Sequence, residues 1–530
     1  MSLAGLRAER LDKLRRLREA GVDPYGSRSS LTGPIARVRA LCPEPEAEAP
    51  APAGGGGPAS GPAPAPAPVT VAGRVVALRD MGKSCWLDLR DQTGHIQANL
   101  VQKRLPDTFG QAKLLDVGDF LEVTGDLSRS RVGEITVFAT GFRFLCKSLE
   151  PLPAKWQGLR DTEIRFRRRY LDLIANGASR ERFLLRSRIF SFVRRWLDER
   201  AFVEVETPVL QRIYGGAAAR PFKTRHHALG TDLYLRISPE TWLKRLLVGG
   251  FDRVYEIARN FRNEGIDASH LPEFTMMEVY QAYGDFTDMM DLAENLVADC
   301  ARALLGTTVV RVGGQEADLA PPWPRASVHE LVAREGGVDP EDGPAMLRRL
   351  EGDRLLAPDQ AAALSSALAA GGEAAARARD GLLKECMDEL VEPRIVRPTF
   401  ATHQPASFNP LCKRTAGQPR LSDRFEVIAA GFELANAFSE LNDPAEQRER
   451  FEAQINPANE EAYCEAVDED YVSALEVGLP PAGGMGIGMD RLVMLLSGQP
   501  SIREVVLFPT LRPKGQAEVM EEMERAEADG

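Results

Sequence analysis

Polar and apolar residues alternate from Val254 to Glu264, and this period of two predicts a β-strand. One face of that strand carries Glu256, Asn260, Arg262 and Glu264, and the other carries Tyr255, Ile257 and Phe261. Gly265 ends the run, Ile266–Pro272 is typical of a loop, and a returning strand places Phe274, Met276, Glu278 and Tyr280 on one face. Because Arg and Glu are rarely buried unless they are paired or bound, this hairpin predicts a polar site.

A second predicted hairpin, Arg424–Asn442, repeats this arrangement. Glu426 lies on its first strand, Gly431 marks the turn, Glu433 follows it, and Asn436, Phe438 and Glu440 share a face of the return strand. Farther on, Gly484, Gly486 and Gly488 alternate, so a flat ligand could lie against the bare backbone of that strand face. Arg491 falls in the first turn of the next predicted helix. The GxGxG spacing without a βαβ context excludes a Rossmann fingerprint.

Five short β-runs separated by turn residues extend from Val69 to Cys146 and predict a small barrel of the OB type. Such barrels often bind oligonucleotides on one strand face, where aromatic side chains stack on bases, and Trp86 and Gln97 are candidates for these contacts. A barrel with a purely structural role is the alternative. The GKS at Gly82–Ser84 is not a P-loop, because Ala77 stands where that motif needs a glycine.

The remaining segments complete an α+β organisation. A basic helix is predicted over Ser2–Ala20, with a narrow stripe of leucines, and is either a solvated helix or an electrostatic contact to nucleic acid. Further helices are expected over Glu181–Arg200 and Asp285–Leu305, and a short strand over Phe202–Pro208. The expected regions are a basic helix region (1–40), a linker rich in Ala, Pro and Gly (41–68), the barrel (69–150), a larger domain (151–513) with a basic hinge at its start and a helical insertion at about 330–395, and an acidic tail (514–530).

Composition narrows the class of protein. A chain of 530 residues, 44% hydrophobic and 27% charged, is expected to form two or three globular domains. Its net charge of −11 argues against a general DNA-coating protein but leaves room for local basic patches. The seven cysteines show no CxxC pairing, which indicates reduced thiols. No signal-peptide pattern and no apolar run long enough for a membrane span are seen, so a cytoplasmic protein is expected.

The polar positions as a set fit a nucleoside triphosphate site. Arg262, Arg491, the glycine strand and Phe274 suit phosphates and a flat ring. Glu426 and Glu433 suit Mg²⁺, which takes oxygen ligands and keeps water and phosphate in its shell. Glu240, Glu278 and Glu440 exceed what Mg²⁺ needs and predict a cationic substrate, although each of them alone is also consistent with a surface or salt-bridged residue. No nucleophile stands beside a base, which favours positioning and charge neutralisation, as in an attack on the α-phosphate of ATP.

Several strings match one family in its order along the chain: RRYLDLI, EVETPVL, GGAAARPF, LYLRISPE, RNFRNEGI, PEFTMMEVYQAY, FSELND, GMGIGMDR and VVLFP. From about residue 69 to residue 513 the sequence resembles a class II lysyl-tRNA synthetase of the bacterial type. The resemblance implies an antiparallel-sheet catalytic domain with an N-terminal OB-fold barrel. It also implies that lysine and ATP form lysyl-adenylate and pyrophosphate, and that the lysyl group then passes to the 3′ end of tRNA(Lys). A homodimer is implied too, with the segment around Pro208 in its interface.

The resemblance further implies roles for individual residues. Arg262 and Arg491 would be the catalytic arginines, and the ATP site would comprise Arg262, Glu264, His270, Phe274 and Arg491. The lysine pocket would comprise Gly216, Glu240, Glu278, Tyr280, Asn436 and Glu440, with Glu278 and Glu440 near the ammonium group. Glu426 and Glu433 would bind Mg²⁺, and Arg79, Trp86, Gln97 and Glu134 would bind the anticodon.

The sequence departs from the family pattern at several positions. Ser269 and Leu271 stand where Arg and Asn are common, and Ala435 and Ala437 replace glycines, so a methyl group is expected near the lysine site. None of these changes removes a phosphate, metal or ammonium contact, and an active enzyme is expected. One alternative is a catalytically weak paralogue that serves as a tRNA-binding or regulatory protein. Another is a ligase that lysylates a protein, although such ligases lack the barrel.

Overall fold

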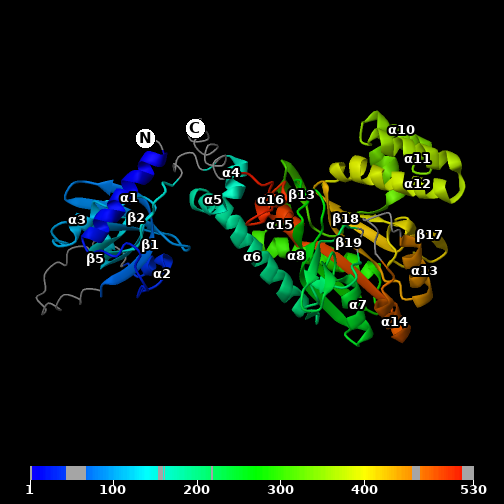
Figure 1. Cartoon of the computed structure of the whole chain (residues 1–530), viewed down its shortest axis with the longest axis horizontal. Coiled ribbons are helices and arrows are strands. Elements are labelled where there is room, and N and C mark those ends of the chain that lie inside the picture. Colours follow the sequence, from blue (N-terminus) through cyan, green and yellow to red (C-terminus); the bar gives the residue numbers. More distant parts are fainter. Residues whose placement is uncertain are drawn as a thin grey trace, which may run out of the picture. The chain divides into compact units, whose positions relative to one another are not determined.

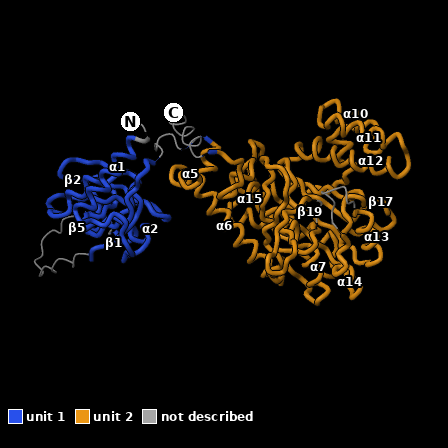
Figure 2. The backbone as a smooth tube through the Cα atoms, in the orientation of Figure 1, with its two compact units in different colours: residues 1–161, 515–530 blue, residues 162–514 orange. Residues whose placement is uncertain are grey.

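The computed structural model describes residues 3–42, 67–152, 159, 161–216, 219–455 and 466–515. The chain forms two compact units, Met1–Asp161 with Gly515–Gly530 and Thr162–Lys514 (Figure 2). Most of the predicted linker, most of the acidic tail and most of the segment 153–160 lie outside the described residues. No helix in the described part of the chain is long and apolar enough to cross a membrane.

The first unit contains a closed barrel with the strand order β1-β2-β3-β5-β4, which confirms the predicted OB-type barrel. Its strands are β1 (Val69–Asp80), β2 (Ser84–Arg90), β3 (His95–Val101), β4 (Phe120–Arg129) and β5 (Ile135–Cys146). The period of two sets its inner and outer faces. On β2, Cys85, Leu87 and Leu89 are buried in the barrel core, whereas Trp86 and Asp88 are half-buried on the outer face.

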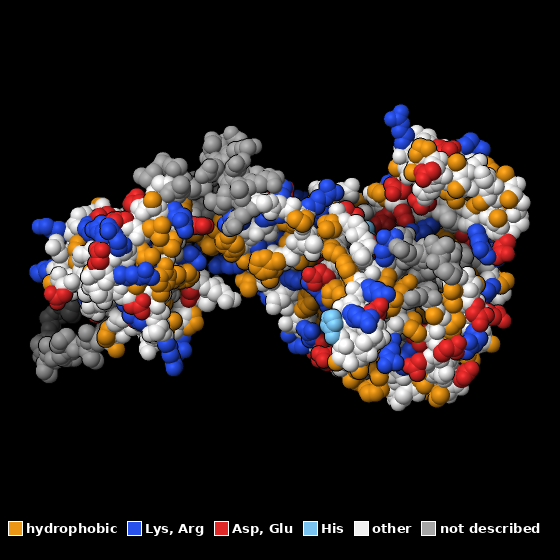
Figure 3. Space-filling model, in the orientation of Figure 1, with side chains coloured by type: hydrophobic (Ala, Val, Ile, Leu, Met, Phe, Trp, Pro, Cys, Tyr) orange, Lys and Arg blue, Asp and Glu red, His pale blue; other side chains and the backbone are white. Residues whose placement is uncertain are grey.

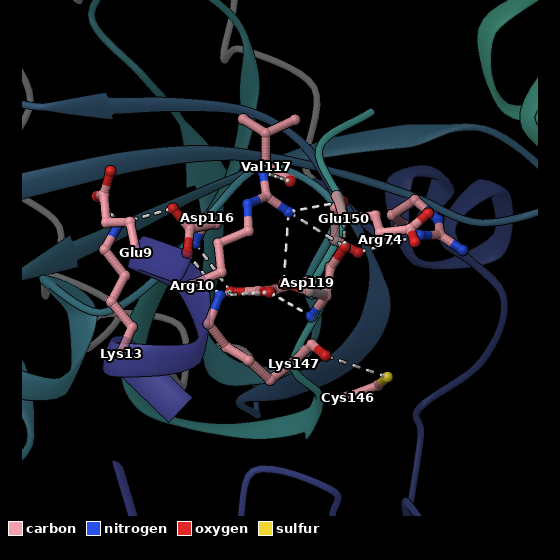
Figure 4. A network of polar contacts seen from close by, with 12 residues as sticks. Glu9, Arg10, Lys13, Arg74, Asp116, Val117, Asp119, Cys146, Lys147 and Glu150 are labelled. Atoms are coloured by element: carbon pink, nitrogen blue, oxygen red, sulfur yellow. Dashed lines mark hydrogen bonds and ion pairs between the residues drawn. The ribbon is translucent and has the colours of Figure 1, made fainter. Parts of the chain in front are cut away.

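The predicted basic helix is present as α1 (Leu3–Glu19), and it docks on the barrel. Leu17 belongs to the barrel core, whereas Leu11 is 38% exposed. Figure 4 shows a polar network beneath α1, in which Arg10 donates to the carbonyl oxygens of Val117 and Glu150, Lys13 pairs with Asp116, and buried Lys147 pairs with Asp116 and Asp119. Part of the positive charge of α1 therefore fixes the helix to the barrel, a role that neither interpretation of the sequence included.

The second unit is organised around an eight-stranded sheet with the order β14-β15-β18-β19-β20-β11-β10-β6. Its strands are β6 (Val203–Glu204), β10 (Arg253–Phe261), β11 (Glu273–Ala282), β14 (Arg325–Ser327), β15 (Thr399–Thr402), β18 (Arg424–Ala429), β19 (Phe432–Ser439) and β20 (Ala482–Gly488). Neighbouring strands are antiparallel except in the pairs β14–β15 and β10–β6. Both predicted hairpins, β10–β11 and β18–β19, are confirmed.

Three helices cover one face of this sheet (Figure 1): α6 (Gly177–Asp198), α8 (Phe286–Leu305) and α15 (Met489–Ser497). Their apolar side chains share one core with Met277 and Val279 of β11 and with Met485 and Ile487 of β20. Because side chains alternate along a strand, the intervening residues of these strands project to the opposite face. That face carries Glu278, Tyr280, Gly484, Gly486 and Gly488, as the sequence pattern predicts.

Helices occupy the range where the insertion is expected, and Figure 1 shows α10, α11 and α12 packed side by side. These helices are α10 (Gly343–Gly352), α11 (Pro358–Ala370) and α12 (Gly372–Cys386), and a π-helical turn, η2 (Met387–Val391), continues α12. Met346, Leu350 and Leu382 form part of a separate core that reaches Ala401 and Ile428 of the sheet. The insertion is therefore packed onto the eight-stranded sheet rather than linked to it by a loose connection.

The other elements are short. In the first unit they are α2 (Ile35–Ala40) and α3 (Phe109–Ala112). In the second unit they are α4 (Thr162–Arg167), α5 (Arg169–Ala175), β7 (Leu210–Gln211), β8 (Lys223–His226), β9 (Thr231–Leu235), α7 (Glu240–Val248), β12 (Val309–Val312), β13 (Gln315–Asp318), α9 (Val328–Leu331), η1 (Val332–Gly336), η3 (Glu392–Arg394), η4 (Ala406–Phe408), β16 (Arg414–Thr415), β17 (Gln418–Ser422), α13 (Pro444–Gln454), α14 (Glu469–Gly478) and α16 (Ile502–Val505). On the face in Figure 3, Lys and Arg are interspersed with Asp and Glu on both units.

Two predicted boundaries are wrong. The strand predicted over Val254–Glu264 ends at Phe261, so Arg262 and Glu264 lie in the loop that follows β10. The alternating pattern runs past the strand end because the polar loop residues happen to continue it. The strand predicted over Phe202–Pro208 is only Val203–Glu204, a two-residue parallel edge of the sheet.

Candidate active site

Two adjoining cavities lie along the polar face of the sheet, and the smaller one also reaches Asp490 and Arg491 of α15 and Ile502 of α16. The larger has a volume of about 470 Å³ and the smaller about 150 Å³. Both are lined by Arg262, Met276, Glu433, Asn436 and Gly486, so they share a wall. The sequence pattern anticipated this meeting of the two hairpins and the glycine strand, because Gly486 pairs with Glu278 on one side and with Asn436 on the other.

The smaller cavity brings together the residues predicted to hold ATP. Its lining includes Arg262, Glu264, His270, Phe274 and Arg491. The Arg262 guanidinium lies 5.0 Å above the centre of the Phe274 ring, and its Nε is buried without a hydrogen-bond partner among the described residues. Burial lowers the pKa of Arg262, while the carboxylates of Glu264, Glu433 and Glu278 oppose that shift. A buried guanidinium with an unused donor fits an anionic ligand.

The loop between β10 and β11 joins Arg491 at this cavity. His270 Nδ1 lies 2.9 Å from a carboxylate oxygen of Asp267, and its Nε2 lies 3.4 Å from Nη2 of Arg491. Arg491 also donates to the backbone carbonyl oxygen of Glu433 at 2.6 Å. The α15 arginine, the loop histidine and the β19 glutamate are thus held close together at one end of the cavity.

Glu426 and Glu433 both line the larger cavity, on paired strands β18 and β19. Burial raises the pKa of Glu426, Arg424 opposes this, and the negative charge of Glu433 adds to the rise. Burial also acts on Glu433, but Arg491 and Asn436 hold the pKa of its carboxyl below the usual range. A cation between the two would relieve their repulsion, so the pair fits Mg²⁺. Among the described residues no group of three or more His, Cys, Asp or Glu side chains could hold a metal, so phosphate and water would complete the shell.

The other end of the larger cavity is lined by Gly216, Glu240, Glu278 and Tyr280. Glu278 accepts hydrogen bonds from the Ser238 hydroxyl at 3.0 Å and from the Tyr280 hydroxyl at 2.8 Å. Burial, together with the charge of Glu240, raises the pKa of Glu278 to about 7. A carboxylate held at this cost inside the protein fits a cationic ligand group that neutralises it.

Lys244 is the charged residue at this end that sequence reasoning missed. Its ammonium lies 2.6 Å from Glu240 and also contacts Glu440, and its side chain is fully buried. Glu440 sits behind Gly484, where a Cβ would overlap its carboxylate, and it does not line either cavity. The signal that could have found Lys244 is its position four residues after Glu240, a spacing that brings two side chains together on a helix such as α7. The charge of the three carboxylates Glu240, Glu278 and Glu440 is therefore partly balanced inside the protein by one cation, Lys244.

Two further positions, Glu256 and Ala435, have surroundings that the sequence did not predict. Glu256 lies on no cavity wall and instead pairs with Arg236 at 2.6 Å and accepts a hydrogen bond from Thr207. Ala435 packs in the core beneath the sheet and lines only the smaller cavity. The methyl group expected near the lysine site therefore lies by the predicted ATP site, because position 435 alternates with Asn436 on β19.

The predicted anticodon residues lie on the barrel strands or next to them. Trp86 packs edge-to-face on Phe138 with ring centroids 6.5 Å apart, and Asn99 pairs with both residues in the strand register. Gln97 accepts a hydrogen bond from Thr136. Arg79 lies 3.8 Å from Asp88, and Glu134, just before β5, pairs with Arg39. The outer barrel face thus carries an aromatic pair, of which the sequence pattern had indicated only Trp86.

Comparison with known proteins assigns a family to each of the two units. Residues 161–512 match the family described as tRNA synthetases class II (D, K and N), and residues 69–145 match the OB-fold nucleic acid binding domain. A lysine–tRNA ligase of Moorella thermoacetica is 46% identical over 514 residues, covering 96% of this chain and 98% of that protein. Lysine–tRNA ligases of Pelotomaculum thermopropionicum (45%, covering 95% and 94%) and Synechococcus sp. strain CC9311 (46%, covering 97% and 100%) are similarly close. The chain belongs to the class II tRNA synthetases, in the family of these lysine–tRNA ligases.

Proposed function

We propose that the protein is a lysine–tRNA ligase, which activates lysine with ATP and transfers it to the 3′ end of tRNA(Lys). The observation that carries this proposal is the continuous wall between the two cavities, which joins a buried arginine to a pocket of buried carboxylates. The names of the full-length relatives support the same activity.

The smaller cavity is the proposed nucleotide site. The purine would lie on Gly486 and Gly488, where there are no side chains, and against the Phe274 ring. Arg262 would hold the α-phosphate and the lysine carboxylate, and Arg491 the outer phosphates. Glu426 and Glu433 would hold Mg²⁺, which would neutralise phosphate charge when bound.

The lysine end is proposed to work by charge balance. When all three are ionised, the carboxylates of Glu240, Glu278 and Glu440 against the one internal ammonium of Lys244 leave two negative charges, equal in number to the two ammonium groups of a bound lysine. An aspartate substrate would place its side-chain carboxylate against Glu278, and an uncharged side chain would leave that buried carboxylate unpaired. Gly216, Tyr280 and Asn436 would complete the pocket.

The chemistry needs no covalent enzyme intermediate. In the first step an oxygen of the lysine carboxylate attacks the α-phosphorus of ATP. The bond between the α-phosphorus and the oxygen that bridges to the β-phosphate breaks, and pyrophosphate leaves. Arg262 stabilises the charge that develops on the α-phosphate, because it is buried and already oriented by Phe274. In the second step a terminal ribose hydroxyl of tRNA attacks the lysyl carbonyl carbon, and AMP leaves with the electron pair.

The barrel is proposed to bind the anticodon. Its outer face offers Trp86 for stacking, with Arg79, Gln97 and Glu134 for polar contacts. This use is consistent with the OB-fold match, and the alternative of a purely structural barrel predicts that removal of Trp86 impairs charging and pyrophosphate exchange together.

A homodimer in the cytoplasm is also proposed. β6 is an edge strand of the sheet, and β6 and the segment after it expose several apolar side chains: Val203 45%, Val209 38%, Leu210 47% and Ile213 38%. An exposed apolar edge of this kind fits a second copy of the chain. The six cysteines of the described residues are all free thiols, which fits a reducing compartment.

Lysine-dependent ATP–pyrophosphate exchange without tRNA tests the first step. Exchange with lysine, and little with arginine, ornithine or aspartate, is the expected result. Absence of exchange with every amino acid, in a folded sample containing Mg²⁺, would favour a catalytically weak paralogue. That alternative gains no support from the main charged positions, because Arg262, Arg491, Glu426 and Glu433 all line the cavities; Ser269, in the wall of the smaller cavity, stands where Arg is common in the family.

A further inference from the structure

The helical insertion supplies part of the wall of the larger cavity. Lys384 at the end of α12, and Met387 and Asp388 in the turn η2, line this cavity on the side that also carries Glu426. Since the rest of the insertion packs on its own core, these residues are its contribution to the proposed reaction site.

The Lys384 ammonium reaches into this cavity with one described partner. Its Nζ lies 2.8 Å from Oδ2 of Asp388, one helical turn away, and its side chain is 59% exposed. Burial lowers the pKa of Lys384, but the charges of Asp388 and Glu426 act in the opposite direction and raise it overall, so the group is a cation at neutral pH. The core of the insertion includes Ile428, two residues after Glu426 on β18, and Glu392, which follows η2, accepts a hydrogen bond from the backbone N–H of Glu433, so this part of the insertion lies at the proposed metal and phosphate end.

Binding of phosphates at this end requires cations that are not already paired with a carboxylate. The cavity walls carry three arginines, of which Arg424 pairs with Glu426 and Arg491 with Glu433, which leaves Arg262 as the arginine without a carboxylate contact within 4 Å among the described residues. The loop from Glu264 to Pro272 contains no Lys or Arg. A triphosphate carries about four negative charges near neutral pH, whereas the three arginines and one Mg²⁺, offset by Glu426 and Glu433, would supply three positive charges, which leaves room for a further cation.

We propose that Lys384 is a phosphate-binding residue, through which the helical insertion contacts the outer phosphates of ATP and the pyrophosphate product. This inference rests on the proposed function. A lysine serves such a site as a mobile point charge, and Lys384 can exchange its exposed partner Asp388 for a phosphate oxygen by rotation about its side-chain bonds.

A matched pair on the same helix provides the control. Arg377 pairs with Glu373 at the same spacing of four residues, its side chain is 72% exposed, and it lines neither of the two cavities. A cation that only stabilises α12 would behave like Arg377. Removal of a cation that binds the outer phosphates would weaken the binding of ATP and pyrophosphate more than the binding of AMP.

The test compares Lys384→Met, Lys384→Arg and Arg377→Met in the full chain. Equilibrium binding of ATP and of AMP would be measured, together with the KM values for ATP, pyrophosphate and lysine in exchange. For Lys384→Met we expect ATP and pyrophosphate to weaken about tenfold or more, since a charge-assisted hydrogen bond is lost. AMP binding and the lysine KM should change less than about twofold. Lys384→Arg should keep most of the affinity for ATP, and Arg377→Met should match the wild type.

Each other outcome overturns the proposal. Unchanged ATP and pyrophosphate affinities would leave Lys384 as a surface ion pair, and equal losses for ATP, AMP and lysine would mean that it acts on the whole site. Failure of the proposed function is separately visible, because the wild-type protein would then show no lysine-dependent exchange while its ATP and AMP affinities could still be compared.

Discussion

Lys244 and Glu440 form an ion pair in the second unit, and neither side chain is exposed to solvent. The same ammonium lies 2.6 Å from Glu240, a residue of the cavity wall. One internal cation thus links a wall carboxylate to a carboxylate behind the wall, and it sets the charge that a bound amino acid meets.

Replacing Lys244 by Met is expected to lower the free energy of unfolding by about 3–5 kcal/mol, because removing one partner leaves buried charges unpaired. Urea unfolding followed by circular dichroism measures this. The control Lys223→Met breaks a pair with Asp232 whose side chains are 58% and 40% exposed, and it should cost less than about 1 kcal/mol. Similar losses for the two variants would contradict the buried counter-charge.

Lysine binding should strengthen as the pH rises through 7. The pKa of Glu278 is raised to about 7, and an ammonium group is attracted only by the ionised carboxylate. The ionised fraction is about one tenth at pH 6 and about nine tenths at pH 8, so the lysine KM should fall about tenfold over this range. The unliganded fold should show the opposite trend. Since the folded-state pKa lies above the unfolded value, this group stabilises the fold less as the pH rises from about 4.5 to 7.

Two variants separate Glu278 from other groups that titrate near neutrality. Glu278→Gln should raise the lysine KM and remove its pH dependence while ATP affinity changes little. Glu392 also has a pKa of about 7, but it accepts a hydrogen bond from the backbone N–H of Glu433, at the phosphate end. Glu392→Gln should therefore keep the pH dependence of the lysine KM. If this variant lost the pH dependence, the titrating group would be Glu392 rather than Glu278.

Gly484→Ala should damage the lysine end specifically. A Cβ at position 484 would overlap the Glu440 carboxylate and the Tyr280 ring, so both side chains would have to move. Overpacking of this kind costs about 1–3 kcal/mol of stability, and we expect lysine kcat/KM to fall more than ATP affinity. Gly381→Ala, on helix α12 with no atom within 4 Å of the added Cβ, should be neutral or slightly stabilising. A loss of ATP and lysine binding in equal measure in Gly484→Ala would count against the local role.

Trp86→Ala should weaken tRNA charging and spare pyrophosphate exchange. Stacking of one base on an aromatic ring contributes about 1–3 kcal/mol, which corresponds to a rise of roughly five- to 150-fold in the KM for tRNA. Aminoacylation and exchange are measured on the same preparation. Loss of both activities would mean that the ring packed on Phe138 supports the fold of the barrel instead.

Much of the site could be predicted because it is built on strands. A period of two assigns each residue to a face, so alternation alone places Glu278, Asn436 and Gly486 on the polar faces of the two hairpins and the glycine strand, and the strand register joins them. The barrel was predictable for the same reason, since β-runs and turn residues alternate regularly.

The rest depends on contacts that no local pattern encodes. The pairing of Lys244 with Glu440 joins a helix to the residue that follows the distant strand β19, and β10 ends at Phe261 although the alternation continues to Glu264. The position of Lys384 on the cavity wall follows from how the insertion packs on the sheet. In sequence it is a lysine on an alanine-rich helix, like others that face solvent.

Charging of tRNA(Lys) tests the central claim most directly. The purified chain would be incubated with ATP, Mg²⁺, tRNA(Lys) and radiolabelled lysine, with arginine, ornithine and aspartate in parallel. We predict that lysyl-tRNA forms and that the other three amino acids are charged poorly or not at all. A folded sample that forms no lysyl-tRNA, or that charges one of the others in preference to lysine, would contradict the proposed function.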